Sequence, residues 1–370
     1  MTHTDEPADI VARASAGGGA RGGAGDIVLS ADGVSAGYGA RSRNVLHDVT
    51  VAIARGHTMG VVGESGSGKS TLARVLVGRL APSRGVVRLD GTDVHRLSRK
   101  ERFAARRRIQ LVPQDPYSSL DPRMSVGRAL AEAIDPRGRL RTGAHRDRIA
   151  ELLESVALDA TAARRLPHEF SGGQRQRIVI ARALAARPQV VIADEVTSSL
   201  DTSVQAEILE LLLDLQRRLG LTYVFITHDL AIAQYMCSDL SVLYLGTLVE
   251  RGTADVLSRP AHPYTELLRD SRPDPSGRSL LAPAAGFANE DVADPANPPS
   301  GCVFHPRCRY GPRAHEDRDR CAAEPPLLRD VPLLARTAAC HYPIGPSAKN
   351  PDTTAPENTP DASGEDASGE

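Results

Sequence analysis

The segment from Gly63 to Thr71 carries residue types that bind phosphate, in the order Gly63-Glu64-Ser65-Gly66-Ser67-Gly68-Lys69-Ser70-Thr71. This order fits the pattern GxxxxGK[ST], in which backbone N–H groups and the N-terminus of the following helix converge on anionic oxygens. Glycine lets the backbone approach those oxygens closely. We therefore expect Lys69 to reach the β- and γ-phosphates of a nucleotide and the Ser70 hydroxyl to bind Mg²⁺. A plain glycine-rich turn is the alternative, and the complete match after an apolar stretch disfavours it.

Two carboxylates follow another apolar stretch. Residues 190–193 are Val-Val-Ile-Ala, and Asp194 and Glu195 come directly after them. The carboxyl ends of parallel strands are where α/β folds place their ligands. We expect Asp194 to hold Mg²⁺ through water and Glu195 to polarise an attacking water. Alone, such a strand end is weak evidence, but downstream of a phosphate loop it predicts nucleotide hydrolysis.

Gln114 and His228 also come after apolar stretches, residues 109–112 and 223–227. Gln114 can supply a neutral oxygen to Mg²⁺ and to the water. His228 can bond the γ-phosphate or the water from the opposite side. Taken singly, each is better explained as an ordinary loop residue than as a site residue. Because both follow separate core strands, we interpret them as site residues.

The stretches that must position these side chains alternate between strand-like and helix-like patterns. Residues 59–62 predict the buried strand that feeds the phosphate loop, and residues 70–80 predict the helix that follows it. Residues 125–166 are rich in Ala, Leu and Arg, which predicts a helical insertion. The alternation as a whole predicts an α/β core with a parallel sheet.

Composition narrows the classes of function. The chain has 370 residues, of which 41% are hydrophobic, enough for one large domain and a smaller appendage. Its 45 Lys and Arg nearly balance its 46 Asp and Glu, so no overall field attracts nucleic acid or an acidic membrane. The basic stretch 96–108 is interpreted as a solvated helical face, and no nucleic-acid partner is expected.

The sequence offers no candidate for a membrane span or a secretory signal. A spanning helix needs roughly 18 to 20 consecutive apolar residues, and no stretch approaches that length. The N-terminus is polar and then rich in Gly and Ala, without a basic start and an apolar core. We expect a cytosolic location, with other chains crossing the membrane if the protein works there.

Ser171-Gly172-Gly173-Gln174 resembles the signature sequence of ATP-binding cassette (ABC) ATPases. With the phosphate loop, Gln114, the Asp194-Glu195 pair, a D-loop containing Asp201 and the switch residue His228, the resemblance covers about residues 27–270. It implies a P-loop fold with an antiparallel β subdomain, a RecA-like core with a parallel sheet and a helical subdomain. It also implies that the signature caps the γ-phosphate of ATP bound to a second ATPase subunit.

Two further positions, Tyr38 and Val196, can be compared with the family pattern. Tyr38 matches the aromatic residue that stacks on adenine, although a tyrosine before a glycine is often just a turn residue. Val196 stands where the family usually has proline. The change leaves both carboxylates in place and is expected to loosen the turn into the D-loop.

A narrower resemblance is to the ATPases of oligopeptide, dipeptide and nickel permeases. It rests on residues 112–124 around Gln114, on His262-Pro263-Tyr264-Thr265, and on residues 168–177, which are similar to the second of two paired ATPase subunits. The resemblance implies an ATPase that powers import of peptides or a related small solute. Its partners would be a second, different ATPase subunit, two transmembrane permease subunits and, indirectly, a solute-binding protein. The location would then be peripheral, on the cytoplasmic face of the cell membrane.

Four cysteines lie close to the C-terminus: Cys302, Cys308, Cys321 and Cys340. In a cytosolic chain such clustering favours metal or cluster ligation over disulfides. Four thiols can hold a [4Fe-4S] cluster or a tetrahedral Zn²⁺, and free buried thiols are the third possibility. The resemblance to the permease extension implies an iron–sulfur cluster, which at least some members of that family carry. Cys237 stands apart and is expected in the core.

These patterns divide the chain into predicted regions. Residues 1–25 and 345–370 are expected to be disordered tails. Residues 26–258 form the ABC ATPase domain, with a helical subdomain at about 115–180, and residues 259–344 form a C-terminal extension with the four cysteines. Two other functions stay open: a soluble ABC ATPase that acts on nucleic acid or ribosomes without transport, and a redox-sensing or metal-binding module in which ATP hydrolysis is secondary.

Overall fold

A computed structural model describes residues 26–39, 44–138, 142–271, 294, 297–332 and 334–345. The two predicted tails, residues 1–25 and 345–370, lie outside the described residues apart from residue 345. In the part of the chain that is described, none of the helices combines the length and the hydropathy needed to cross a lipid bilayer.

A small antiparallel sheet forms the N-terminal part. Its strands lie in the order β2 (Leu46–Ala54), β1 (Ile27–Ala36), β4 (Arg84–Leu89) and β5 (Thr92–Asp93). The apolar side chains of this sheet share one hydrophobic core with helix α2 (Lys69–Leu76), the helix that follows the phosphate loop. The small sheet therefore supports that helix from one side.

The larger sheet positions the site. Its strands lie in the order β11 (Arg329–Asp330), β12 (Arg336–Ala338), β10 (Thr247–Thr253), β9 (Asp239–Tyr244), β3 (Thr58–Val62), β8 (Thr222–Thr227), β7 (Val190–Asp194) and β6 (Ile109–Val112). The strands from β9 to β6 are parallel, whereas β10, β12 and β11 are added antiparallel. Strands β3 and β8 are buried along their whole length, as in sheets with both faces covered. The loops after β3, β6, β7 and β8 meet at one edge of the sheet.

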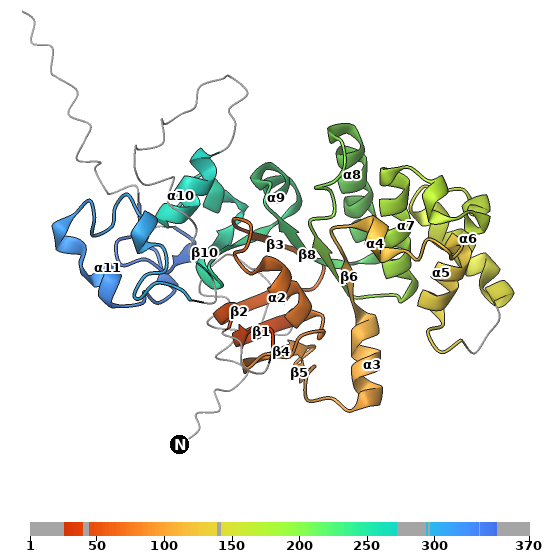
Figure 1. Ribbon diagram of the computed structural model, residues 1–370, viewed down its shortest axis with the longest axis horizontal. Helices are drawn as coiled ribbons and strands as arrows, with labels where there is room; N and C mark the ends of the chain where they lie inside the picture. The colour runs from red at the N-terminus through yellow and green to blue at the C-terminus, as the bar shows by residue number, and fades with distance from the viewer. Residues whose placement is uncertain are drawn as a thin grey trace, which may run out of the picture.

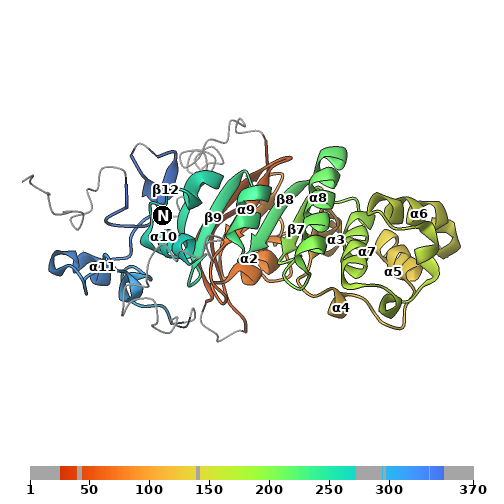
Figure 2. The same ribbon diagram turned by 90° about the horizontal axis from the view of Figure 1, so that it is seen from above.

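The α-helices of the described residues, besides α2, are α3 (Arg99–Arg108), α4 (Pro116–Ser119), α5 (Val126–Ile134), α6 (Arg146–Ser155), α7 (Gly172–Ala185), α8 (Thr202–Leu219), α9 (Leu230–Met236), α10 (Pro263–Asp270) and α11 (Arg320–Ala323). Short 3₁₀ helices lie at Thr142–His145, Ala160–Arg164, Pro167–Glu169, Ala254–Leu257, His305–Arg307 and Glu316–Arg318. Figures 1 and 2 place α5, α6 and α7 together at one end of the molecule and α11 at the opposite end, with the larger sheet between them.

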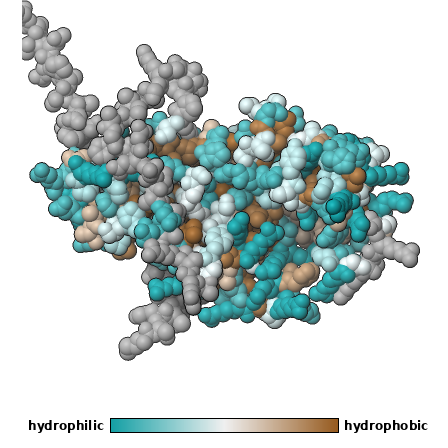
Figure 3. Space-filling view, in the orientation of Figure 1, coloured by the Kyte–Doolittle hydropathy of each residue, from teal (hydrophilic) through white to brown (hydrophobic). Residues whose placement is uncertain are grey.

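The α/β fold expected from the sequence is confirmed, as is a helical insertion after residue 125. One helix end differs: α2 stops at Leu76 rather than near residue 80. Gly78 has φ +74°, a left-handed conformation that commonly ends helices. Helix α3 buries only Ala105, which agrees with a solvated basic helix. The face drawn in Figure 3 is largely hydrophilic in the region of that helix.

The C-terminal extension (residues 259–344) contributes two strands, β12 and β11, to the larger sheet. Strand β12 pairs with β10. Its Arg336 is 1% exposed and lies 3.6 Å from Glu250 and 2.8 Å from Asp255, both in the preceding part of the chain. Because a buried guanidinium needs such partners, this contact fixes the extension onto the sheet.

Candidate nucleotide site

The phosphate loop connects β3 to α2 and is held tightly from behind. Gly63 has φ +155°, and a Cβ there would come within 2.2 Å of the Leu243 carbonyl oxygen, so only glycine fits. Gly246 donates its N–H to the Ser67 carbonyl at 2.9 Å. The Lys69 ammonium donates to the Gly63 and Glu64 carbonyls at 2.8 and 2.7 Å. The loop is thus folded around its own lysine.

Asp194 and Glu195 lie at the end of β7, beside the start of α2. The Ser70 hydroxyl donates to the Asp194 carboxylate at 3.2 Å. Glu195 has φ +49°, an uncommon conformation for a side-chain-bearing residue that often marks functional sites. Its N–H bonds the Ile226 carbonyl of β8 at 2.9 Å. The two candidate magnesium ligands Ser70 and Asp194 are therefore adjacent.

Gln114 and His228 both converge on the Glu195 carboxylate. The Gln114 side-chain nitrogen donates to Glu195 Oε2 at 2.8 Å and lies 3.4 Å from the Ser198 hydroxyl. His228 Nδ1 lies 3.4 Å from Glu195 Oε1. The strand ends thus bring together the four predicted groups, Asp194, Glu195, Gln114 and His228, around one point beside the phosphate loop.

Burial adjusts the charges at this point. It lowers the pKa of Lys69, although the nearby carboxylates Glu195, Asp194 and Glu64 oppose this effect. It raises the pKa of Asp194, and the Ser70 hydrogen bond opposes that change. Burial thus makes the charged form of Asp194 costly even beside Lys69, and a divalent cation bound there would reduce that cost.

The signature residues lie on a different element. Ser171 caps α7: its hydroxyl accepts from the Gln174 N–H at 3.3 Å, and the Gln174 side chain accepts from the Ser171 N–H at 3.1 Å. A Cβ on Gly173 would come within 2.4 Å of a Val204 methyl, so glycine lets α7 approach α8. In both ribbon views α7 is separated from α2. The structure does not bring Ser171, Gly172, Gly173 and Gln174 to the phosphate loop of the same chain.

Two other predicted residues have local structural partners. Asp201 caps α8 by accepting from the Val204 N–H at 3.0 Å. Tyr38 is 44% exposed, and the Arg74 guanidinium donates to its hydroxyl at 2.9 Å. The hydroxyl also lies 3.2 Å from that of Thr71 at the start of α2. An exposed ring at the edge of the phosphate-loop helix is accessible for stacking.

Comparison with known proteins decides the family. The sequence pattern of the family described as "ABC transporter" matches residues 46–198, and that described as "Oligopeptide/dipeptide transporter, C-terminal region" matches residues 249–314. A probable peptide ABC transporter ATP-binding protein of Sinorhizobium fredii is 46% identical over 299 residues, which cover 80% of this chain and 82% of that protein. The chain belongs to the ABC transporter ATP-binding proteins of the oligopeptide/dipeptide type.

Two further comparisons agree with this family. A putative peptide import ATP-binding protein of Brucella ovis is 46% identical over 310 residues, covering 82% of this chain and 94% of that one. Among solved structures, a dimeric ABC cassette in a post-hydrolysis state bound to ADP and Pi is 30% identical, with a TM-score of 0.54. The aligned region covers 61% of this chain and 98% of the chain in that structure. The ABC fold expected from the motifs is confirmed.

The turn after Glu195 carries Val196 where the family pattern of this ABC protein has proline. The Val196 side chain is 1% exposed and belongs to the main core. Ser198 donates its N–H to the Glu195 carbonyl at 3.2 Å and its hydroxyl to the same oxygen at 3.0 Å. Burial of Val196 and these bonds support the turn, and the expected loosening relative to proline stays a prediction.

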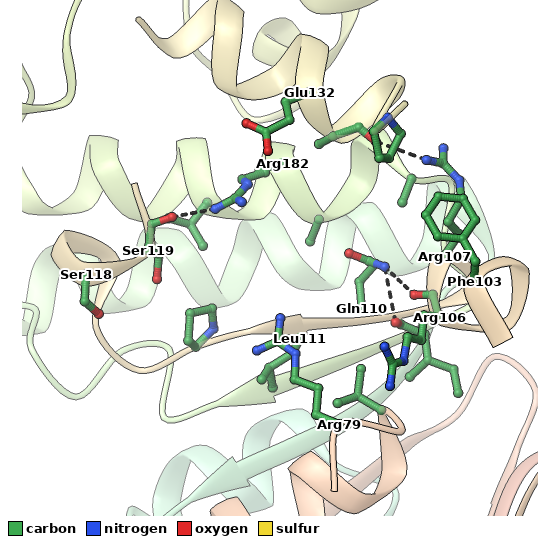
Figure 4. A pocket seen from close by; sticks show the side chains of 18 residues that line it. Arg79, Phe103, Arg106, Arg107, Gln110, Leu111, Ser118, Ser119, Glu132 and Arg182 are labelled. Carbon is green, nitrogen blue, oxygen red and sulfur yellow. Dashed lines mark hydrogen bonds between the residues drawn. The ribbon is translucent and has the colours of Figure 1, made fainter. Parts of the chain in front are cut away.

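A groove separates the core of this ABC protein from its helical part (Figure 4). It has a volume of about 670 Å³, and Pro113, next to Gln114, is part of its wall. Arg107 spans it by donating to the Ala133 and Ile134 carbonyls at 3.2 and 3.3 Å. Its charged lining is mainly positive, with a single carboxylate: Arg79, Arg106, Arg107, Arg182 and Glu132.

The four cysteines of the extension line one small cavity, together with His262, His305 and His341. All four are free thiols. Burial, together with neighbouring thiols, raises the pKa of Cys302 to about 11 and that of Cys308 to about 12. Within the described residues, no group of three or more His, Cys, Asp or Glu side chains is arranged to hold a single metal ion. Cys237 lies in the main core, as predicted.

Two residues at the phosphate loop were missed by the sequence analysis. The Tyr264 hydroxyl accepts from the Glu64 N–H at 2.8 Å, and Arg307 forms two hydrogen bonds to the Glu64 carboxylate. Tyr264 had been noted only as part of the extension's His-Pro-Tyr-Thr segment. Nothing in residue spacing signals either contact, because the partners are 200 and 243 positions apart.

Proposed function

We propose that this chain is the ATP-hydrolysing subunit of a multi-subunit ABC importer for peptides or a related small solute. The observation that carries the proposal is the convergence of Gln114 and His228 on Glu195, beside a phosphate loop whose Ser70 contacts Asp194. The relatives named for peptide transport and the oligopeptide/dipeptide C-terminal region support the choice of solute class.

Each side chain has a role in hydrolysis under this proposal. Lys69 holds the β- and γ-phosphates through charge-assisted hydrogen bonds. Ser70 and Asp194, with the Gln114 oxygen, would hold Mg²⁺, which neutralises charge on the transferring phosphoryl group. Glu195 accepts a hydrogen bond from Gln114 and polarises the attacking water, and His228 contacts the γ-phosphate. Tyr38 stacks on adenine.

The signature helix supplies its anion site to a second subunit. Its glycine-rich N-terminus offers backbone N–H groups to a γ-phosphate. Since the views in Figures 1 and 2 separate α7 from α2, a partner cassette is needed to complete each ATP site. We infer that this partner is a second, different ATPase subunit, as in the paired permeases that the sequence resembles.

The groove in Figure 4 is the proposed docking place for a permease subunit at the cytoplasmic face of the membrane. It adjoins Gln114, so a segment seated in it would sense movement of that residue. Four arginines against one glutamate favour an acidic segment, and Phe103 and Leu111 add apolar contact area. Coupling between ATP and solute would then pass through discrete conformational states.

We propose that the four thiols, which line one cavity, ligate a [4Fe-4S] cluster, although their side chains are not arranged to hold a single metal ion in the described residues. Iron and sulfide analysis of anaerobically purified full-length protein tests this. Near-stoichiometric iron and sulfide, with visible absorption that Cys308→Ser abolishes, is expected. Zinc in their place supports the alternative ion, and the absence of both metals leaves free thiols.

Reconstitution tests the main proposal. The chain is coexpressed with its candidate partner ATPase and permease subunits, and the purified complex is placed in proteoliposomes with labelled peptides and the solute-binding protein. ATP-dependent peptide uptake is expected, and the matched complex carrying Glu195→Gln should not support it. Uptake that is independent of Glu195, or hydrolysis stimulated by RNA or ribosomes but not by peptide-loaded binding protein, contradicts the proposal.

A further inference from the structure

Glu64 is the one carboxylate inside the phosphate loop, and each of its polar groups is bound. Arg307 Nη1 donates to its Oε2 at 2.8 Å, and Arg307 Nη2 donates to its Oε1 at 3.1 Å. The Glu64 N–H donates to the Tyr264 hydroxyl at 2.8 Å. Its carbonyl accepts from the Lys69 ammonium. The position of Glu64 therefore affects the lysine that is to hold phosphate.

Arg307 is itself held in place by the extension. It is 8% exposed and ends a 3₁₀ turn directly before Cys308. Its guanidinium lies 5.8 Å from the Tyr244 ring centre and 6.0 Å from that of Phe304. Tyr244, Tyr264 and Phe304 also contact one another, with ring centres 4.5 to 5.4 Å apart. A planar guanidinium fixed in this way presents a bidentate fork in one orientation.

The charge of Glu64 links its contact with Arg307 to phosphate binding. A carboxylate in a loop that receives a polyphosphate repels it, and the repulsion is strong where the surroundings are partly buried. The Glu64 side chain is 26% exposed. The fork from Arg307 neutralises the carboxylate and draws it toward the extension. Without Arg307, Glu64 would keep an unpaired charge beside the phosphate site.

We propose that Arg307, assisted by Tyr264, is a positioning residue for the ATP site: from the C-terminal extension it holds Glu64 and thereby keeps the phosphate loop open to nucleotide. The inference rests on the proposed ATP binding at this loop. It assigns the extension a direct effect on nucleotide affinity, in addition to any metal that its cysteines bind.

Equilibrium binding of MgATP to the full-length chain tests this, with thermal unfolding measured in parallel. Arg307→Ala is expected to weaken binding about tenfold, as for the loss of a charged hydrogen-bonded partner. Adding Glu64→Gln to Arg307→Ala should restore at least about threefold of the affinity, because the unpaired charge is removed. Arg320→Ala is the matched control: it removes an arginine whose 2.8 Å partner, Glu324, is also in the extension, and it should bind ATP like the wild type.

The outcomes separate the possible failures. If the wild type binds no MgATP, the proposed function fails. If the wild type binds but Arg307→Ala matches Arg320→Ala, or if Glu64→Gln rescues nothing, the positioning role is wrong and Arg307 serves the fold alone. If Arg307→Ala does not fold, Tyr264→Phe decides: a loss of about threefold in affinity supports the role, and unchanged affinity overturns it.

Discussion

The helix that follows the phosphate loop and the helix that follows the signature differ in how their N-termini are capped. Gly68, the N-cap of helix α2, provides no side-chain cap, which leaves the first N–H groups of the helix open to a ligand. Ser171, the N-cap of helix α7, forms a capping box with Gln174, in which its hydroxyl accepts from the Gln174 N–H. Around α2 stand Asp194, Glu195 and their contacts. The difference agrees with our proposal that the α2 terminus carries this chain's own phosphate loop, whereas the α7 terminus would complete the site of a second chain.

The sharpest test of the whole site is Glu195→Gln, which keeps its shape and removes its charge. Hydrolysis should fall about a thousandfold, since general-base assistance is lost, while MgATP affinity stays within about twofold. Phosphate release and nucleotide titration measure the two quantities. Glu207→Gln, an exposed carboxylate paired with Arg177, serves as control. Wild-type turnover in Glu195→Gln would refute the assigned role.

A charge in the signature should affect turnover but not binding by a single chain. Ser171→Glu places a carboxylate where the partner's γ-phosphate is proposed to bind, and turnover of the assembled complex should fall about a hundredfold by electrostatic repulsion. MgATP affinity of the isolated chain should be unchanged. Weaker binding by the isolated chain would mean that the signature also acts on its own phosphate loop, and the comparison above would fail.

Lys69→Ala should affect nucleotide binding by the isolated chain, in contrast to the signature substitution. It removes the ammonium that the loop folds around, so MgATP affinity of the isolated chain should fall at least about tenfold. Hydrolysis should fall with it. Arg79→Ala, on the nearby groove rather than in the loop, is the control. Equal affinities for Lys69→Ala and wild type would show that nucleotide binds elsewhere.

The smallest expected effect concerns stability and pH. Burial raises the pKa of Asp194, so folded Asp194 binds its proton more tightly than the unfolded chain does. Its charged form therefore costs stability at neutral pH, and that cost disappears at acidic pH. Asp194→Asn should unfold at a higher temperature than wild type at pH about 7.5, with a difference that shrinks toward pH about 4. Saturating MgATP should reverse the order, because the ion favours the carboxylate. A variant that is less stable at neutral pH without nucleotide contradicts this account.

Much of the fold and site was accessible from sequence because the decisive signals are local. Candidate site residues lie at a strand's last position or within two residues after it, as Gly63, Gln114, Asp194 and His228 do, and parallel strands bring such residues to one edge. The contacts of Arg175 are not local in this sense. Its Nε donates to the Pro167 carbonyl at 2.7 Å, and its guanidinium lies 4.2 Å from the Tyr117 ring centre. Such contacts depend on how helices pack.

By itself the sequence determined the chemistry: the residue types of the phosphate loop, the paired carboxylates and the signature each have a local pattern tied to backbone geometry. Only the tertiary structure decided how the C-terminal extension meets the ATP site. Arg307 and Tyr264 contact Glu64 across more than half the chain, and no periodicity links residues that far apart. The strand pairing of β12 with β10 and the aromatic packing around Arg307 fix that contact, because they place the extension against the phosphate loop.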